Sequence, residues 1–233
     1  MEHIDKVSGT FDKRVQEAAK PAVSAAVIKR LPRYHRYLGD LIAAGRLRIS
    51  SAELSKIMNV TASQIRQDLN CFGGFGQQGY GYNIKYLYGK ISELLGVNEG
   101  YSAVIVGAGN LGRALASTRM FSRRGVNRLA LFDIDESIIG TEIYGIKVYS
   151  VDELFDFCQR EKVDIGVLTV PKEAAHAAAK TMAAAGVKGI WNFANMELSL
   201  DDDSVVVENI HLGDSLMTLC YEIKTRGEEG ADE

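Results

Sequence analysis

The chain has 233 residues, of which 46% are hydrophobic and 24% charged, so it can bury the cores of one large or two modest domains. No apolar run approaches the roughly 18 residues that span a bilayer, and the first six residues lack the layout of a signal peptide, so we expect no membrane association. Three widely spaced cysteines fit no metal or disulfide pattern and predict a reduced, cytoplasmic setting without a metal site.

The net charge of −3 conceals a division along the chain. Residues 1–90 carry 14 Lys and Arg against 7 Asp and Glu, whereas residues 91–233 carry 13 against 23. Because phosphate neutralisation dominates nucleic-acid binding, a basic segment on an acidic body is typical of a nucleic-acid-binding protein. Chance variation of charge is the alternative, and the motifs decide between the two.

Residues 1–21 form a mixed polar extension, which precedes the first periodic segment. Apolar residues recur at steps of three and four over residues 22–45 and predict a helix. Pro32 lies inside this segment, so we expect a break or a helix start near it.

Two short helices are predicted next. Ser50 or Ser51 can cap the first, with Glu53 placed to support a capping box. Thr61 caps the second, which runs to about Cys71 with Ile65 and Leu69 facing inward. Two short helices joined by a tight turn are typical of a helix-turn-helix.

Glycines and aromatic residues alternate over residues 73–82 and predict a hairpin or wing, and residues 84–96 read as a helix. We therefore expect residues 22–97 to form a winged-helix DNA-binding domain. Gln and Arg side chains early in the second helix can read base edges, and the surrounding cations can contact phosphate. The expected DNA-binding residues are Arg30, Arg33, Arg46, Arg48, Ser63, Gln64, Arg66, Gln67, Gln77, Gln78 and Lys85.

From residue 98 the pattern changes to strands alternating with helices, which predicts an α/β domain with a parallel sheet over residues 98–211. Its strands are expected at residues 103–106, 129–133, 147–149, 165–170, 189–193 and 205–207. Its helices are expected from the loop at 107–112 to about Arg124, at 151–160 and at 173–186. A final helix at 212–226 precedes an acidic tail at 227–233.

A G-x-G-x-x-G fingerprint follows the first of these strands and opens a helix. It comprises Gly107, Ala108, Gly109, Asn110, Leu111 and Gly112. Gly107 allows the tight turn, Gly109 lets the backbone approach a pyrophosphate, and Gly112 lets the helix lie close to the strand. Asp133 ends the next strand, where a carboxylate binds ribose hydroxyls and repels a 2′-phosphate. The pattern predicts a Rossmann site for NADH and NAD+ in preference to NADP.

Two later strands end on the same edge of the expected sheet. Thr169, Val170 and Pro171 follow one of them, and Asn192 and Phe193 follow the other. These five residues are candidates for the nicotinamide side of the site, and ordinary strand ends are the alternative.

Three functions are compatible with a nucleotide site. A dehydrogenase would need an acid or base, for which Lys172 or His176 are the candidates, but no clear catalytic pair is present. The second compatible function is that of a scaffold that binds CoA. A DNA-binding regulator accounts for both the basic helix-turn-helix and the fingerprint, so we expect a regulator without enzyme activity or catalytic residues.

Several motifs in this order resemble the redox-sensing transcriptional repressor family Rex. They are Ile65-Arg66-Gln67-Asp68-Leu69, the glycine-aromatic run from Phe72 to Tyr82, the fingerprint loop, Leu168-Thr169-Val170-Pro171, and Gly189-Ile190 with Asn192-Phe193-Ala194. The resemblance runs from about residue 22 to 226.

This resemblance implies a homodimer with a winged helix, a Rossmann domain and a C-terminal helix swapped onto the partner. It implies competitive binding of NADH and NAD+, and release of a palindromic operator by NADH. A two-fold dimer fits such an operator, because its half-sites fall on one face of the duplex.

The chain departs from the family pattern at two kinds of position. Gln67 and Gln78 stand where the family often has basic residues, which lowers the expected nonspecific affinity. The family switch of Arg, Tyr and Asp falls on Arg36, Thr118 and His211. Because an Arg–Asp pair cannot form with His211, we expect the cofactor-dependent contact to use other groups or to respond differently to NAD+.

Overall fold

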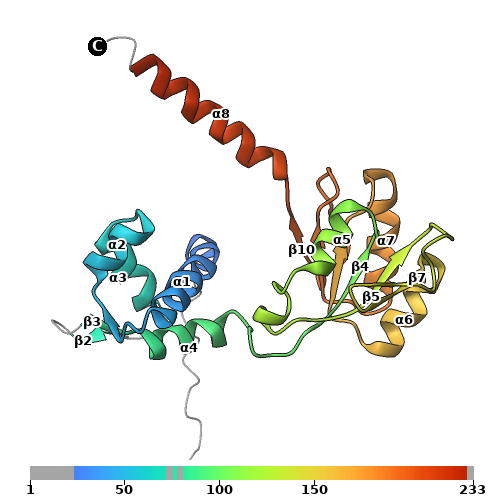
Figure 1. Cartoon of the computed structure of the whole chain (residues 1–233), viewed down its shortest axis with the longest axis horizontal. Helices are drawn as coiled ribbons and strands as arrows, with labels where there is room; N and C mark the ends of the chain where they lie inside the picture. Colours follow the sequence, from blue (N-terminus) through green and yellow to red (C-terminus); the bar gives the residue numbers. More distant parts are fainter. Residues whose placement is uncertain (1–23, 72–75, 78–80, 230–233) are drawn as a thin grey trace, which may run out of the picture. The chain divides into compact units, whose positions relative to one another are not determined.

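The computed structural model describes residues 24–71, 76–77 and 81–229 (Figure 1). The chain forms two compact units, Met1–Leu95 and Gly96–Glu233. The border lies two residues before the expected one at 97/98. The expected extension at 1–21 and most of the wing lie outside the described residues.

The first unit begins with helix α1 (Ala25–Ala43), which Ser24 caps. The expected break at Pro32 is wrong, because the helix continues through it. The buried stripe of Val27, Leu31, Tyr34 and Leu38 runs across the proline, and this burial offsets the roughly 3 kcal/mol that an interior proline costs.

Helices α2 (Ser51–Met58) and α3 (Ala62–Asn70) confirm the predicted helix-turn-helix. Ser50 and Glu53 form the full capping box, and Thr61 accepts from the backbone N–H of Gln64 at 3.1 Å. Asn59 makes the turn in the left-handed region at φ 51°. Local signals alone specify both helix starts.

The capping box makes stability depend on pH through Glu53. The backbone N–H of Ser50, the Ser50 hydroxyl and the Arg46 guanidinium lower the pKa of Glu53 from its ordinary 4.5 to about 2. The contribution of ionised Glu53 to the free energy of unfolding is therefore fully present above pH 4.5 and is lost as the pH falls through 2. We expect Glu53→Gln to lower the melting temperature at pH 7, and the difference from the unsubstituted chain to shrink between pH 4.5 and 2. Thermal melts across this range test this, with exposed Glu136→Gln as the control; a difference that does not change with pH contradicts it.

A small antiparallel sheet in the order β1-β3-β2 completes the first unit, with helix α4 (Ile84–Leu94) following it. The strands are β1 (Arg48–Ile49), β2 (Gly76–Gln77) and β3 (Gly81–Asn83). Gly81 has φ 68°, and a Cβ there would lie 2.7 Å from the carbonyl oxygen of Ile49, so only glycine fits this crossing. Leu54, Ile65 and Leu87 are fully buried in the core that α1–α4 share.

The second unit is a three-layer α/β domain around a seven-stranded sheet in the order β10-β9-β8-β4-β5-β7-β6. All pairs are parallel except the edge pair β6–β7. The strands are β4 (Ser102–Val106), β5 (Asn127–Asp133), β6 (Glu142–Ile143), β7 (Ile146–Ser150), β8 (Ile165–Leu168), β9 (Gly189–Asn192) and β10 (Val206–Asn209).

Helices cover the two faces of this sheet (Figure 1). Side chains of α6 (Leu154–Glu161) and α7 (Lys172–Ala184) share one core with Val104 and Phe132. On the other face, Ala116 of α5 (Asn110–Ser117) and Phe121 share a core with Ile105 and Leu131, and the 3₁₀ turn η1 (Ser122–Arg124) follows Phe121. A second 3₁₀ turn, η2 (Val151–Glu153), precedes α6. The chain order reverses between β4 and β8, which creates a switch point at their carboxyl ends.

The predicted helix from the fingerprint to Arg124 is wrong beyond Ser117. Thr118 has extended backbone at ψ 148°, and Arg128 of β5 donates to the carbonyl oxygens of Ala116 and Thr118. A side chain from a neighbouring strand thus takes the acceptors that the next helical turn would use. Gly125 then closes the 3₁₀ turn at φ 67°.

Helix α8 (Leu212–Glu229) ends the described chain. Six large apolar side chains on it are between 51% and 67% exposed: Leu212, Leu216, Met217, Leu219, Tyr221 and Ile223. In the part of the chain that the structure describes, no helix is long and apolar enough to cross a membrane.

Candidate dinucleotide site and DNA-binding face

The three fingerprint glycines each meet a different steric condition. Gly107 has φ 101°, and a Cβ on it would lie 2.7 Å from the carbonyl oxygen of Thr169. A Cβ on Gly112 would lie 1.9 Å from the carbonyl oxygen of Gly107, because α5 packs closely on β4. A Cβ on Gly109 would meet no described atom within 4 Å, so the backbone there faces open space. A tight turn, a close helix and an open approach are the three conditions that a pyrophosphate loop requires.

The first turn of α5 supplies free backbone donors beside this open space. The first hydrogen bond within the helix runs from Arg113 N to Gly109 O at 2.9 Å, so the N–H groups of Asn110 and Leu111 have no intrahelical acceptor. Arg113 also donates through Nε to Ala108 O at 2.7 Å, which places a cation beside the loop. This arrangement attracts an anion.

Asp133 lies beside the loop, where the sequence places it. One carboxylate oxygen accepts from Ala108 N at 2.6 Å, and the other accepts from Ile134 N at 2.8 Å and Asp135 N at 3.0 Å. A carboxylate has about four lone-pair sites, so a vicinal diol can still donate to it.

A cavity of about 550 Å³ opens at the carboxyl ends of β4, β5 and β8, which is the switch point of the sheet. Gly107, Gly109, Asp133, Thr169, Val170 and Pro171 line it, all of them predicted site residues. Sequence reasoning missed its other lining residues, among them Ile134, Val151, Asp152, Ala174 and Thr181. The signal that could have found Val151 and Asp152 is their position directly after the strand β7.

Asn192 and Phe193, the other two candidates, do not line this cavity. Asn192 is fully buried, and its Nδ2 donates to Met196 O at 3.0 Å and to Asn209 Oδ1 at 2.8 Å. Phe193 packs edge-on against Trp191 at 4.6 Å on the α5 face of the sheet. In this structure both residues hold the strand ends in place.

The alternative catalytic residues also lie outside the cavity. Lys172 and His176 are exposed on α7 and do not line it. The residues that line the cavity are therefore mostly apolar, with Asp133, Asp152, Thr169 and Thr181 as the polar ones beside the glycines.

The exposed face of α3 forms a shallow hollow of about 510 Å³. Ser63, Arg66 and Gln67 line it together with Asn70 and Cys71. Arg66 Nη1 donates to Ser51 Oγ at 3.1 Å, which holds the guanidinium against the start of α2. Arg48 and Lys85 are also exposed, whereas Gln78 and the side chain of Gln77 lie outside the described residues.

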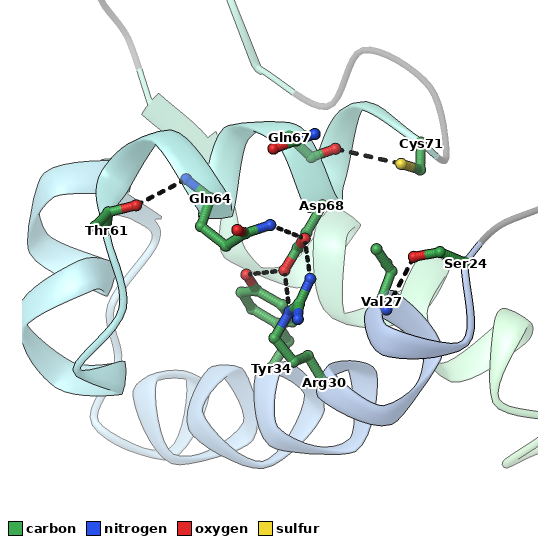
Figure 2. A network of polar contacts seen from close by, with 9 residues as sticks. All are labelled: Ser24, Val27, Arg30, Tyr34, Thr61, Gln64, Gln67, Asp68 and Cys71. Carbon is green, nitrogen blue, oxygen red and sulfur yellow. Dashed lines mark hydrogen bonds and ion pairs between the residues drawn. The ribbon is translucent and has the colours of Figure 1, made fainter.

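Four other predicted DNA contacts hold the first unit together. Arg30 forms a two-pronged pair with buried Asp68, and Gln64 donates to the same carboxylate (Figure 2). Arg33 donates to Met58 O, and Arg46 to Glu53 at 2.8 Å. Sequence patterns cannot distinguish Arg30 and Arg33 from phosphate contacts, because their partners lie 38 and 25 residues away along the chain.

The three expected switch positions have distinct surroundings. The Arg36 guanidinium lies 5.2 Å from the Tyr37 ring centre. Thr118 ends α5, and its hydroxyl donates to Leu115 O at 3.0 Å. His211 Nε2 lies 3.0 Å from Glu197 Oε1, so this chain pairs a histidine with a glutamate just before α8.

A helix-turn-helix unit with a polar exposed face and a separate dinucleotide fold define the class of ligand-responsive DNA-binding regulators. Two family profiles agree with this division. One, described as "Putative DNA-binding protein N-terminus", matches residues 22–70. The other, described as "CoA binding domain", matches residues 98–196.

Full-length relatives define the family. Redox-sensing transcriptional repressor Rex of Thermoanaerobacter pseudethanolicus is 50% identical over 204 residues, which cover 88% of this chain and 91% of the relative. Rex of Caldicellulosiruptor saccharolyticus is 51% identical over 207 residues, which cover 89% and 94%.

Solved structures agree. RSP, a Rex-family repressor, in complex with β-NAD+ and operator DNA has a TM-score of 0.83 and 48% identity, with 90% of this chain and 96% of RSP covered. RSP in complex with β-NADH has a TM-score of 0.83 and 44% identity, with 92% and 100% covered. The chain belongs to the Rex family of redox-sensing transcriptional repressors. The expected family, fold class and regulatory rather than enzymatic role are confirmed.

Proposed function

We propose that this chain binds a palindromic operator as a cytoplasmic homodimer and that NADH releases it from the DNA, so that repression follows the NADH/NAD+ ratio. The observation that carries this proposal is the presence, in one chain, of a fingerprint loop with all three glycine conditions and an exposed recognition face on α3. The domain bounds proposed are a winged helix at 22–97, a Rossmann domain at 98–211 and a dimerisation helix at 212–226, with an extension and a tail at either end.

The cofactor site proposed extends from the fingerprint loop to Pro171. The pyrophosphate binds the N–H groups of the first turn of α5, the adenine ribose binds Asp133, and the nicotinamide lies toward Thr169 and Val170. The cavity supports this because Gly109, directly before α5, lines one continuous space at the switch point together with Asp133, Thr169 and Val170. Asn192 and Phe193 support the site by positioning the neighbouring strand end.

Asp133→Ala is expected to weaken NADH binding by roughly ten- to a hundredfold, since a charged hydrogen bond contributes about 1.5–3 kcal/mol. It also removes the negative charge that repels a 2′-phosphate, so the preference for NADH over NADPH should fall. Calorimetric titration with both cofactors measures the two effects. Asp135→Ala is the control, because that carboxylate bonds Ser137 and does not line the cavity. Unchanged affinities in Asp133→Ala would place the ribose elsewhere.

The DNA site proposed consists of α3 and its surroundings. Ser63, Arg66 and Gln67 read bases in the major groove, while Arg48, Lys85 and the wing residues Gln77 and Gln78 contact the backbone. Arg30, Arg33 and Arg46 primarily hold these elements in position, as their contacts within the unit indicate. Gln64 bonds Asp68 from the first turn of α3 and belongs to the base-reading set. The response to NADH passes through Arg36, Thr118 and the His211–Glu197 pair in place of the family's Arg–Asp contact.

Titrations of the protein with operator DNA at several NADH/NAD+ ratios test the function. The salt concentration is held constant, because salt alone shifts DNA affinity by orders of magnitude. We expect NADH to weaken operator binding and NAD+ to oppose that effect. Arg66→Ala is expected to abolish specific DNA binding while it leaves NADH binding intact. If neither cofactor changes operator affinity, the sensing function fails. Stronger thermal stabilisation by CoA than by NADH would favour a CoA-binding scaffold instead.

A further inference from the structure

A buried carboxylate connects α1 to the recognition helix α3. Asp68 is fully buried, and its two oxygens accept four hydrogen bonds within 2.9 Å (Figure 2). Arg30 Nη2 and Nε each donate at 2.7 Å to a different oxygen, and the Tyr34 hydroxyl donates at 2.9 Å. Burial raises the pKa of Asp68, but the hydrogen bonds from Arg30, Gln64 and Tyr34 outweigh that effect and hold the pKa below its usual value. The carboxylate is therefore charged and cannot rotate.

The fourth donor to Asp68 is the side-chain amide of Gln64, whose Nε2 lies 2.8 Å from Oδ1. Gln64 lies in the first turn of α3, three residues after the cap Thr61. This N-terminal end of a recognition helix is the end that contacts bases in the major groove. A flip of the amide would place its Oε1 against a fixed negative oxygen. The contact to Asp68 therefore determines which amide atom faces inward.

This orientation leaves a defined pattern on the outer edge of the Gln64 amide. One N–H is used on Asp68. With the hydrogen trans to Oε1 in that bond, Oε1 and the second N–H remain side by side. In the part of the chain that the structure describes, no group donates to Oε1. We propose that Asp68 orients Gln64 so that its amide reads one adenine in each operator half-site. This inference rests on the proposed function.

The choice of adenine follows from the groove edges of the bases. Adenine presents a donor at N6 next to an acceptor at N7, which complements Oε1 and the free N–H of Gln64. Guanine presents two acceptors, one of which would oppose Oε1. Cytosine has a donor without an adjacent acceptor, and thymine has an acceptor and a methyl group. Gln67 is the contrast on the same helix, because its side chain is exposed and its amide forms no hydrogen bond to a described residue.

The test uses the full-length chain and synthetic palindromic duplexes. An operator is first selected from a randomised library, and every half-site position is then changed to each of the four base pairs. We expect the unsubstituted chain to prefer adenine at one position by about tenfold or more, and Gln64→Met to reduce this preference to within about twofold. All other positions should keep their profiles. Gln67→Met, the comparison on the same helix, should change the profile only at a different position and leave the adenine position unchanged.

A second pair of variants tests Asp68 as a positioning residue. Arg30→Met leaves the Asp68 carboxylate and its contact to Gln64, so the adenine preference should persist even where stability falls. Arg30→Met combined with Asp68→Leu replaces the ion pair by apolar side chains and removes the acceptor, so the preference should be lost. Melting temperature and NADH binding report on folding of both variants.

Each outcome decides the inference. An unchanged base profile in Gln64→Met, or a preferred base other than adenine at the affected position, overturns it while operator binding stands. Equal loss of the preference in Arg30→Met and in the double variant removes the positioning role of Asp68. A chain that binds no operator at all overturns the proposed function and this inference with it.

Discussion

Alanine at Gly112 is expected to abolish measurable NADH binding and to destabilise the Rossmann unit, whereas alanine at Gly109 should abolish binding alone. The added Cβ at Gly112 would lie 1.9 Å from Gly107 O and 2.9 Å from Thr169 Oγ1, so α5 must move away from β4. Overpacking of this kind costs about 1–3 kcal/mol. At Gly109 no described atom lies within 4 Å of the added Cβ, so the fold accepts it. The methyl group then occupies the space through which the pyrophosphate would approach.

The two variants separate a packing effect from a ligand effect. Thermal melts should show a lower melting temperature for Gly112→Ala and an unchanged one for Gly109→Ala. Calorimetry should show at least a roughly hundredfold loss of NADH affinity in both variants. Gly89→Ala is the control on helix α4, where an added Cβ meets no described atom within 4 Å. Both site variants should still bind operator DNA but no longer respond to NADH. Ordinary NADH affinity in Gly109→Ala would contradict a pyrophosphate at this loop.

These glycines illustrate what the sequence could predict. The fingerprint, the Ser50 and Thr61 caps and the carboxylate of Asp133 depend on residues within a few positions of one another or on fixed spacing, and each is found where expected. The winged-helix and Rossmann units follow from the same local signals, because periodicity and turn residues specify each element separately.

Where the fold differs from the expectation, or where a predicted site residue is already used within the protein, the cause is a partner that the local pattern does not reveal. The helix after the fingerprint ends early because Arg128, from another strand, bonds its last carbonyl oxygens. Asn192 looks like a ligand-facing strand end, yet its amide is used on Asn209 and Met196. Arg30 looks like a phosphate contact, yet it neutralises Asp68, which is 38 residues away. In each case the local pattern does not reveal which group the side chain bonds, and the cofactor and DNA roles of Asn192 and Arg30 stay predictions.

The exposed apolar residues of α8 point to a partner that the single chain lacks. Leu212, Leu216, Leu219 and Ile223 recur at steps of three and four on one side of the helix, and Met217 and Tyr221 lie on another. A helix that is apolar on more than one side is stable only when it is buried. A second copy of the chain that receives this helix, as the proposed homodimer requires, would bury both sides.

Leu219→Asp combined with Ile223→Asp is therefore expected to produce a monomer that binds NADH but binds the full operator about 10²- to 10⁴-fold more weakly. The loss has this size because two linked half-site contacts become two independent ones. Light scattering gives the mass, and titration with full-site and half-site duplexes gives both affinities. The unsubstituted dimer should prefer the full site strongly, whereas the variant should bind both duplexes with similar affinity.

Thr218→Asp provides the control, because Thr218 is exposed on the polar side of α8, together with Asp214, Glu222 and Thr225, and its hydroxyl donates to Asp214 O. It introduces one of the two negative charges of the double variant and should leave both the dimer and its preference for the full site intact. A double variant that remains dimeric would show that the stripe of Leu219 and Ile223 is not the interface. A monomer that still prefers the full site would separate dimerisation from operator affinity, since a single copy cannot contact two half-sites at once.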